Sequence, residues 1–320
     1  MNIRHLSFRL LEVYITVIRT GSISAAARQL HLTQPTVSLQ IKKLTETVGE
    51  PLLSPKDNRW EMTDVGAELY RAACDVLGRF EDFGQTLAEA REGRWGQVRL
   101  GVVSTATYVV PQILGGFYRS FPAVDVKLTI GNRGRILERF SAQEDDLYIF
   151  SHPPSGPAVR AASILHNPLE LVAPSDHWSK GHKTLEFETL TNERFLIREP
   201  GSATRMAFET WLSAKGLEIH NSLPMESNEA IRLSVGAGLG LAVLSTHTLP
   251  PTDDRFARLS VKGFPLESNW YLVASRDRRL SQAARSLVRF IDQSLARCVD
   301  ARWLNLDHER LKAFTGLETF

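Results

Sequence analysis

The segment GSISAAARQLHLTQPTVSLQIKKL, residues 21–44, joins an alanine-rich stretch to a longer polar stretch through the short sequence HLT. In the preceding residues, 6–19, apolar side chains recur with the period of a helix. Gly21 favours the end of that helix, because glycine readily adopts the left-handed backbone found at helix C-termini. The sequence then predicts a short helix, a tight turn at HLT and a third helix over about residues 34–48.

Residues that begin helices stand at the expected places in this segment. Ser22 or Ser24 can cap the alanine-rich helix, and Thr33 can cap the next one. Pro35 falls in the first turn of that third helix, where its missing N–H costs little. Two short helices joined by a brief turn form a helix-turn-helix, whose second helix can enter the major groove of DNA.

One face of the third helix is apolar and the other is polar and basic. Gln34, Thr36, Ser38 and Gln40 are candidates for hydrogen bonds to base edges. Lysines and arginines of this helix and of the hairpin predicted around PKDNR, including Lys56, are candidates for phosphate contacts. A small helical bundle with a solvated polar face is the alternative that this pattern alone leaves open. The full set of candidate DNA-binding residues is Ser22, Ser24, Thr33, Gln34, Pro35, Thr36, Ser38, Gln40, Lys42, Lys43 and Arg59.

Residues 65–93 carry a second pattern, a heptad repeat of apolar side chains. Positions spaced alternately by four and three residues predict a long helix that pairs with a second helix. Such a dimer would present two recognition helices to two half-sites, whereas a single helix lying on its own domain is the alternative. The repeat consists of Leu69, Ala73, Val76, Phe80, Phe83 and Leu87.

From about Gln97 strands and helices alternate, which predicts an open, mainly parallel α/β sheet. A second unit begins near LELVAPSDH, and the strand NWYLVASRD with the helix after it returns to the first. The predicted fold is therefore α/β, with an N-terminal winged helix-turn-helix, a long linker helix and a two-lobed effector domain. The predicted divisions are 1–64 for DNA binding, 65–93 for the linker helix, 94–300 for the effector domain (lobe I about 94–165 and 269–300, lobe II about 166–268) and 301–320 for a C-terminal tail without assigned role.

Strand-to-helix junctions point to a ligand cleft between the two lobes. VSTATY follows the first strand and GSATR follows FLIREP, so hydroxyl groups and free helix N–H groups gather with a cation. These features predict a small anionic effector, a carboxylate or a phosphate ester, although the same residues also serve as ordinary helix caps. The candidate effector-binding residues are Ser104, Thr105, Thr107, Asn132, Arg133, His152, Arg198, Ser202, Thr204, Arg205 and Asn228.

Composition excludes several classes of protein. The formal charge of +2 is nearly neutral, so any argument for nucleic acid must be local. Two widely separated cysteines, Cys74 and Cys298, suit a reducing compartment. The histidines lack metal-binding spacing, GxSxG is absent, and GAGLG follows a helix, so we expect no metal, cofactor or catalytic set. Without a signal peptide or a membrane-spanning stretch, the protein is expected to be cytoplasmic.

The sequence GSISAAARQLHLTQPTVSLQIKKLTETVGEPLL, followed by MTDVGAEL, resembles the DNA-binding domain of bacterial LysR-type transcriptional regulators. The resemblance implies a winged helix-turn-helix, a dimerising linker helix, commonly a tetramer, and an effector domain similar to periplasmic binding proteins. The chain departs from the family at Leu53, Ser54 and Pro55, where a Phe and then a basic residue are usual.

VVSTATY, IGNR, DLYIFSHPP and FLIREPGSATR resemble the branch that regulates carbon-fixation (Calvin-cycle) operons. Members of that branch respond to phosphorylated metabolites or NADPH. Tyr148 replaces a usual small residue and is expected to narrow the cleft, and His152 stands where that branch tends to carry Arg.

The sequence thus predicts a DNA-binding regulator that responds to a small anion and forms a dimer or tetramer. Two alternatives are an architectural DNA-binding protein without effector and an enzyme on the same two-lobed fold. An enzyme has no need of a helix-turn-helix and a dimer seam, so we expect no enzymatic activity.

Overall fold

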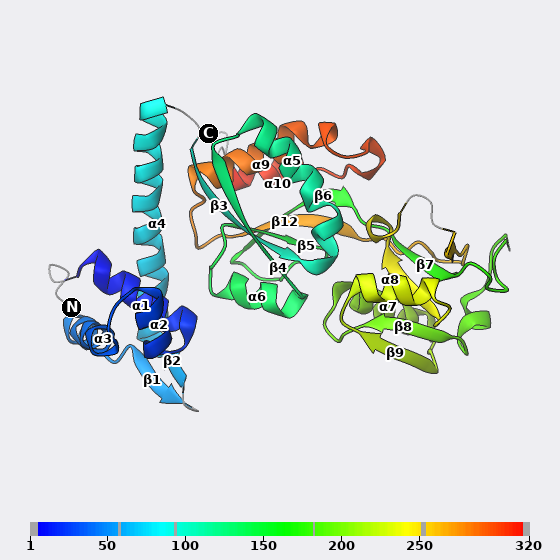
Figure 1. Ribbon diagram of the computed structural model, residues 1–320, viewed down its shortest axis with the longest axis horizontal. Helices are drawn as coiled ribbons and strands as arrows, with labels where there is room; N and C mark the ends of the chain where they lie inside the picture. The colour runs from blue at the N-terminus through cyan, green and yellow to red at the C-terminus, as the bar shows by residue number, and fades with distance from the viewer. Residues whose placement is uncertain (1–5, 57–58, 93–94, 182, 251–253, 316–320) are drawn as a thin grey trace. The chain divides into compact units, whose positions relative to one another are not determined.

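The computed structural model describes residues 6–56, 59–92, 95–181, 183–250 and 254–315 (Figure 1). The chain forms two compact units. The first contains residues 1–93 with 277–281, and the second contains residues 94–276 with 282–320.

The first unit contains the predicted helix-turn-helix. Gly21, with φ of 64°, ends the first helix, and the Ser22 hydroxyl accepts a hydrogen bond from the amide of Ala25 at the start of the second. Thr33 caps the third helix through the amide of Thr36, so the predicted bounds of that helix are confirmed. The elements are α1 (Phe8–Thr20), α2 (Ile23–Gln29), α3 (Gln34–Val48), β1 (Leu53–Lys56), β2 (Arg59–Met62) and α4 (Asp64–Glu92).

Helix α1 lies at the centre of this unit because it has apolar side chains on two sides. Val13 and Val17 pack against α2 and α3, where Val37 of the recognition helix is fully buried. Tyr14 packs with the start of α4 and donates a hydrogen bond to the carbonyl of Gly66, 3.0 Å away. Burial of Val37 in the first of these cores and of Leu44 in the second holds α3 with its polar face outward.

The wing and the linker helix follow as predicted elements. β1 and β2 pair antiparallel, with Leu53 opposite Met62. In α4, Leu69 and Ala73 pack into the core of the unit. Further along the same repeat, Val76, Phe80 and Phe83 are 39%, 56% and 57% exposed, whereas the side chain of Leu87 lies outside the described residues.

Lobe I of the second unit is built on a five-stranded sheet in the order β4-β3-β5-β12-β6. Helices α5 and α9 cover one face, where Phe117 and Phe290 pack edge to face, and α6 covers the other (Figure 1). The expectation of a mainly parallel sheet was wrong, since β12 pairs antiparallel with both β5 and β6. The elements of this part are β3 (Gly96–Val103), η2 (Ser104–Tyr108), α5 (Val110–Ser120), β4 (Val124–Gly131), α6 (Arg133–Ser141), β5 (Leu147–Phe150), β6 (Val159–His166), β12 (Asn269–Ser275), α9 (Gln282–Ser294) and η5 (Leu295–Arg297).

Lobe II has a second five-stranded sheet, in the order β11-β7-β10-β8-β9. Its central strands β7 and β10 are buried on both faces, because alternate residues pack to opposite sides: Leu171 lies in the core with α7, and Val172 lies in the core with α8. The elements are β7 (Leu169–Pro174), η3 (Phe187–Leu190), β8 (Arg194–Arg198), α7 (Ala203–Lys215), β9 (Asn221–Met225), α8 (Asn228–Gly236), β10 (Leu241–Ser245), η4 (Thr246–Thr248) and β11 (Phe256–Arg258).

The predicted separate tail is, over its described part, a component of lobe I. After η6 (Ala301–Trp303), the amides of Asn305 and Asp307 donate to carbonyls of β6. The chain then forms α10 (His308–Thr315), where Leu311 and Phe314 are buried. The apolar side chains of this segment explain why it packs down on the domain.

Among the described residues, no single helix is long and apolar enough to cross a membrane; α1 and α2 meet that test only together, with a 120° bend between them.

Candidate DNA-binding face and effector cavity

The solvent-facing side of α3 carries the residues predicted to contact DNA. Gln34, Pro35 and Ser38 are exposed, as are Lys42 and Lys43, so all five side chains are accessible to a duplex. Ser22 caps α2 and Thr33 caps α3, as the sequence predicted, and Thr33 also bonds to Thr36.

Two neighbours complete this face. The Ser24 hydroxyl donates to Gln34 Oε1 at 3.1 Å, which fixes the orientation of that amide group. Thr36 and Gln40 are half-buried, so they are less accessible than predicted. The side chains of Lys56 and Arg59 lie outside the described residues.

Leu39 is an apolar residue of this face that the sequence did not predict as a DNA contact. It is 66% exposed beside Ser38, on the same solvent-facing side of α3. An exposed aliphatic group on a recognition helix suits contact with the methyl group of thymine.

A small cavity in the second unit is lined by residues of both lobes. Lobe I contributes the ends of β3 and β5 and the start of α6, and lobe II contributes the end of β8 and the start of α7. Ser104, Thr105, Arg133, His152, Arg198 and Ser202, all predicted site residues, line it with Val103, Phe150, Ser151 and Ala203. Ser151 follows β5 as Ser104 follows β3, so the rule that found Ser104 also applies to it.

Arg198 is the polar centre of the interface between the lobes. It is buried, and its Nε lies 2.7 Å from Glu199 Oε2, so its charge is balanced within the protein. Its Nη1 donates to Asn228 Oδ1 at 2.6 Å, and Asn228 Nδ2 donates in turn to Thr105 Oγ1 at 2.9 Å. Asn228 thus supports Arg198 and joins lobe II to lobe I without itself lining the cavity.

Arg133 supplies the available positive charge of the cavity. Its Nε donates to the carbonyl of His152 at 3.2 Å, and among the described residues no carboxylate pairs with it. Burial lowers the pKa of the Arg133 guanidinium. Burial, and after it the Arg133 charge, lower the pKa of His152 below its usual 6.5, so this imidazole is neutral at pH 7.

The remaining predicted effector residues lie elsewhere because local contacts use them. Thr107 donates to the carbonyl of Ser104, and Asn132 caps α6 through the amide of Arg135. Arg205 pairs with Glu209 on the surface of α7, and Thr204 is buried in its first turn. These four residues are not among those that line the cavity.

Tyr148 does not narrow the cleft, contrary to expectation. Its ring is buried and its hydroxyl donates to the carbonyl of Arg139 while accepting from the amide of Asp145. It therefore packs under α6 and does not line the cavity, and the Gly101 backbone leaves space for it.

The described residues contain no group of three or more His, Cys, Asp or Glu side chains that could hold a metal ion. Both cysteines are free.

Comparison with known proteins identifies the chain. Residues 8–67 match the bacterial regulatory helix-turn-helix proteins of the lysR family, and residues 91–296 match the LysR substrate binding domain. A RuBisCO operon transcriptional regulator of Acidithiobacillus ferrooxidans is 37% identical over 91% of this chain and 95% of its own length. The transcriptional activator CmpR of Synechocystis is 36% identical over 88% of this chain and 93% of its own length.

Among solved structures, the regulatory domain of CcmR from Synechocystis, in complex with 2-PG, is 32% identical. It superposes with a TM-score of 0.60 and covers 64% of this chain and 99% of that domain. The two domain matches and the long alignments agree with the helix-turn-helix and the two lobes described above. The chain therefore belongs to the LysR family of DNA-binding transcriptional regulators, in the branch that includes regulators of RuBisCO operons.

Proposed function

We propose that this regulator changes its DNA binding when a small anion occupies the cavity between the lobes. The observation that carries the proposal is Arg133, a cation without a carboxylate partner among the described residues, facing a cavity lined by hydroxyl groups. Buried Ser202 begins α7 without making a side-chain cap, so its hydroxyl and the helix amides remain available to an oxyanion. That CcmR is solved with 2-PG supports an anion as the effector.

The two lobes supply a mechanism for the response. A ligand that contacts Arg133 in lobe I and Ser202 in lobe II stabilises the arrangement in which those residues are close. It shifts the conformational equilibrium by its difference in affinity for the two arrangements, and by no more. The change reaches DNA through the packing of subunits, which sets the spacing of paired recognition helices.

A footprint at fixed salt, with and without 2-PG, tests the proposed function. Protection that shifts with 2-PG supports an effector-responsive regulator, and Arg133→Gln should raise the 2-PG concentration required by about 10- to 100-fold, since a charge-assisted hydrogen bond is lost. Arg135→Gln is the matched control, because this exposed residue is on the same helix and outside the cavity lining. Protection indifferent to 2-PG and to other small anions would instead favour an architectural DNA-binding protein.

The affinity for the anion should increase as the pH falls. A bound anion favours the protonated imidazole, so the pKa of His152 in the complex lies above its lowered value in the free protein. Binding then takes up a proton between those two pKa values and tightens as the pH falls through that range. The measurement is the affinity for 2-PG by calorimetry over a range of pH, in wild type and in His152→Asn. Protonation of 2-PG itself affects both proteins equally, so the difference between their pH profiles reports on His152. Identical pH profiles for both proteins would contradict this role of His152.

For the DNA-binding face, we propose that Gln34 reads bases and that Lys42 contacts phosphate. Gln34→Ala should reduce discrimination between operator and random DNA by about 1–3 kcal/mol, because base-edge hydrogen bonds are lost. Lys42→Ala should weaken binding to all sequences and lower the dependence of log K on log salt by about one. Its ion pair with Glu46 spans 3.9 Å between exposed groups, so folding should be unaffected. Unchanged discrimination in Gln34→Ala would show that another part of α3 faces the bases.

We also propose that α4 pairs with α4 of a second chain. The exposed apolar side chains of Val76, Phe80 and Phe83 support this pairing, and the adjoining exposed ring of Phe8 extends the same apolar surface. Edge strands β4 and β9 carry further exposed apolar residues, Ile130 and Leu223, which supports assembly of dimers into tetramers.

A further inference from the structure

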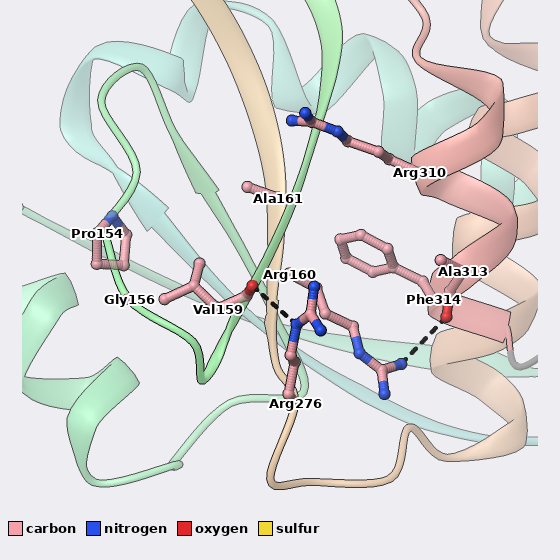
Figure 2. Close-up of a pocket in the computed structure, with 9 residues that line it drawn as sticks. All are labelled: Pro154, Gly156, Val159, Arg160, Ala161, Arg276, Arg310, Ala313 and Phe314. Atoms are coloured by element: carbon pink, nitrogen blue, oxygen red, sulfur yellow. Dashed lines mark hydrogen bonds between the residues drawn. The ribbon is translucent and has the colours of Figure 1, made fainter.

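A second cavity lies entirely within lobe I and shares no lining residue with the cavity between the lobes. Its volume is about 420 Å³, which falls in the range of small-molecule sites. Figure 2 shows its lining, drawn from the loop after β5, from β6, from the end of β12 and from α10. The lining residues are Pro154, Gly156, Val159, Arg160, Ala161, Arg276, Arg310, Ala313 and Phe314.

The cavity arises from the way the C-terminal segment covers β6. This segment hydrogen bonds to the outer edge of the strand at Ser163 and Ile164. It then turns into α10, where the carbonyl of Ala313 accepts a hydrogen bond from Arg160 Nη1, at the beginning of β6, at 3.2 Å. Space therefore remains between the start of β6 and the helix.

Three arginines line this space, and no lining residue described is acidic. Arg160 and Arg276 form hydrogen bonds only to carbonyls, those of Ala313 and Val159, and no carboxylate pairs with either among the residues that the structure describes. A guanidinium has five N–H donors, so most donors of both groups remain available. Arg310 pairs with Asp307 at 3.3 Å, but its side chain is 68% exposed and such a pair is weak.

Like charges gathered at one cavity repel one another, and an anion bound between them removes that repulsion. Guanidinium groups bind phosphate in a bidentate manner, and two of them from different elements can hold separate oxygens of one phosphate. Buried Phe314, together with Val159 and Pro154, offers an apolar wall to the carbon part of a ligand.

We propose that this cavity is a second anion site, which binds a small phosphate ester through Arg160, Arg276 and Arg310. A ligand there connects α10 to the starts of β6 and of the loop after β12. The site is independent of the effector cavity, because Arg133 and Ser202 take no part in it.

Equilibrium dialysis of the full chain against labelled inorganic phosphate tests the site. Arg160→Gln combined with Arg276→Gln should weaken one class of phosphate binding by at least about tenfold, since two charge-assisted contacts are removed. Arg297→Gln combined with Arg302→Gln is the matched control: it removes the same charge from exposed residues near the same C-terminal segment. Arg133→Gln weakens phosphate binding in the effector cavity between the lobes. Phosphate binding that remains in this variant can then be measured for the second site.

The proposal is supported if phosphate binding falls in the Arg160/Arg276 variant and persists in the control. A second variant pair, Arg160→Lys with Arg276→Lys, keeps charge and folding but removes the planar donor geometry, and it should bind phosphate more weakly than wild type. Equal binding by wild type and the Gln variant, or an equal loss in the Arg297/Arg302 control, would overturn the assignment.

Discussion

Replacing Phe80 and Phe83 with aspartate should break the α4 pairing, reduce the assembly to half its size or less, and weaken operator binding by about two orders of magnitude or more. Both rings are more than half exposed on α4, at heptad positions, and the ring of Phe80 also contacts that of Phe8. Aspartate at paired positions places like charges in an apolar contact, which disfavours pairing. A DNA-binding unit that has lost its α4 partner presents one recognition helix, so the gain from simultaneous binding to two half-sites, about 10²- to 10⁴-fold, is lost.

Analytical ultracentrifugation gives the oligomeric state, and a gel-shift titration at fixed salt gives the affinity. Phe80→Leu with Phe83→Leu is the control, since it keeps apolar side chains and should preserve the oligomer. Folding of the aspartate variant is checked by its circular dichroism, because both residues lie outside the buried core. An aspartate variant that sediments as the wild-type assembly would place the subunit contact elsewhere.

Gly66→Ala should destabilise the DNA-binding unit by several kcal/mol and abolish operator binding, while anion binding in the lobes persists. A Cβ at residue 66 would lie 2.1 Å from the carbonyl oxygen of Leu52 and 2.7 Å from the Tyr14 hydroxyl. The Leu52 oxygen belongs to the backbone and the Tyr14 hydroxyl to a buried ring, so moving either atom away would cost considerable free energy. Overpacking a core costs about 1–3 kcal/mol even where side chains can adjust.

Gly78→Ala is the matched control on the same helix. The added methyl group would meet nothing within 4 Å, and alanine is favoured over glycine in a helix by about 1 kcal/mol. Relative to wild type, the thermal unfolding temperature should therefore fall for Gly66→Ala and rise for Gly78→Ala. If Gly66→Ala unfolds at the wild-type temperature, the start of α4 does not pack closely against Leu52 and Tyr14.

The helix-turn-helix could be predicted from sequence because its signals are local. Thr33 and Gly21 act within one turn of their own helix, so a short segment fixes where α3 begins and α1 ends. Ser104 and Ser202 were likewise predicted at the cavity because each follows the end of a strand. The strand and the helix after it fix the position of such a residue.

Features that depend on distant partners could not be predicted in the same way. Asn132 and Thr107 have the right chemistry and position, but local capping bonds turn their side chains to their own backbone. The face of the sheet to which Tyr148 points follows from packing under α6. Strand β6 was missed because VRAASILH has no clear alternation, and its pairing with β12 is what makes it a strand.

The hydrogen bonds from Asn305 and Asp307 to β6 have a consequence for solubility. β6 is the outermost strand of its sheet, and an uncovered outer strand is a template for pairing with strands of other molecules. By occupying those backbone groups, the C-terminal segment protects the domain from aggregating through this edge.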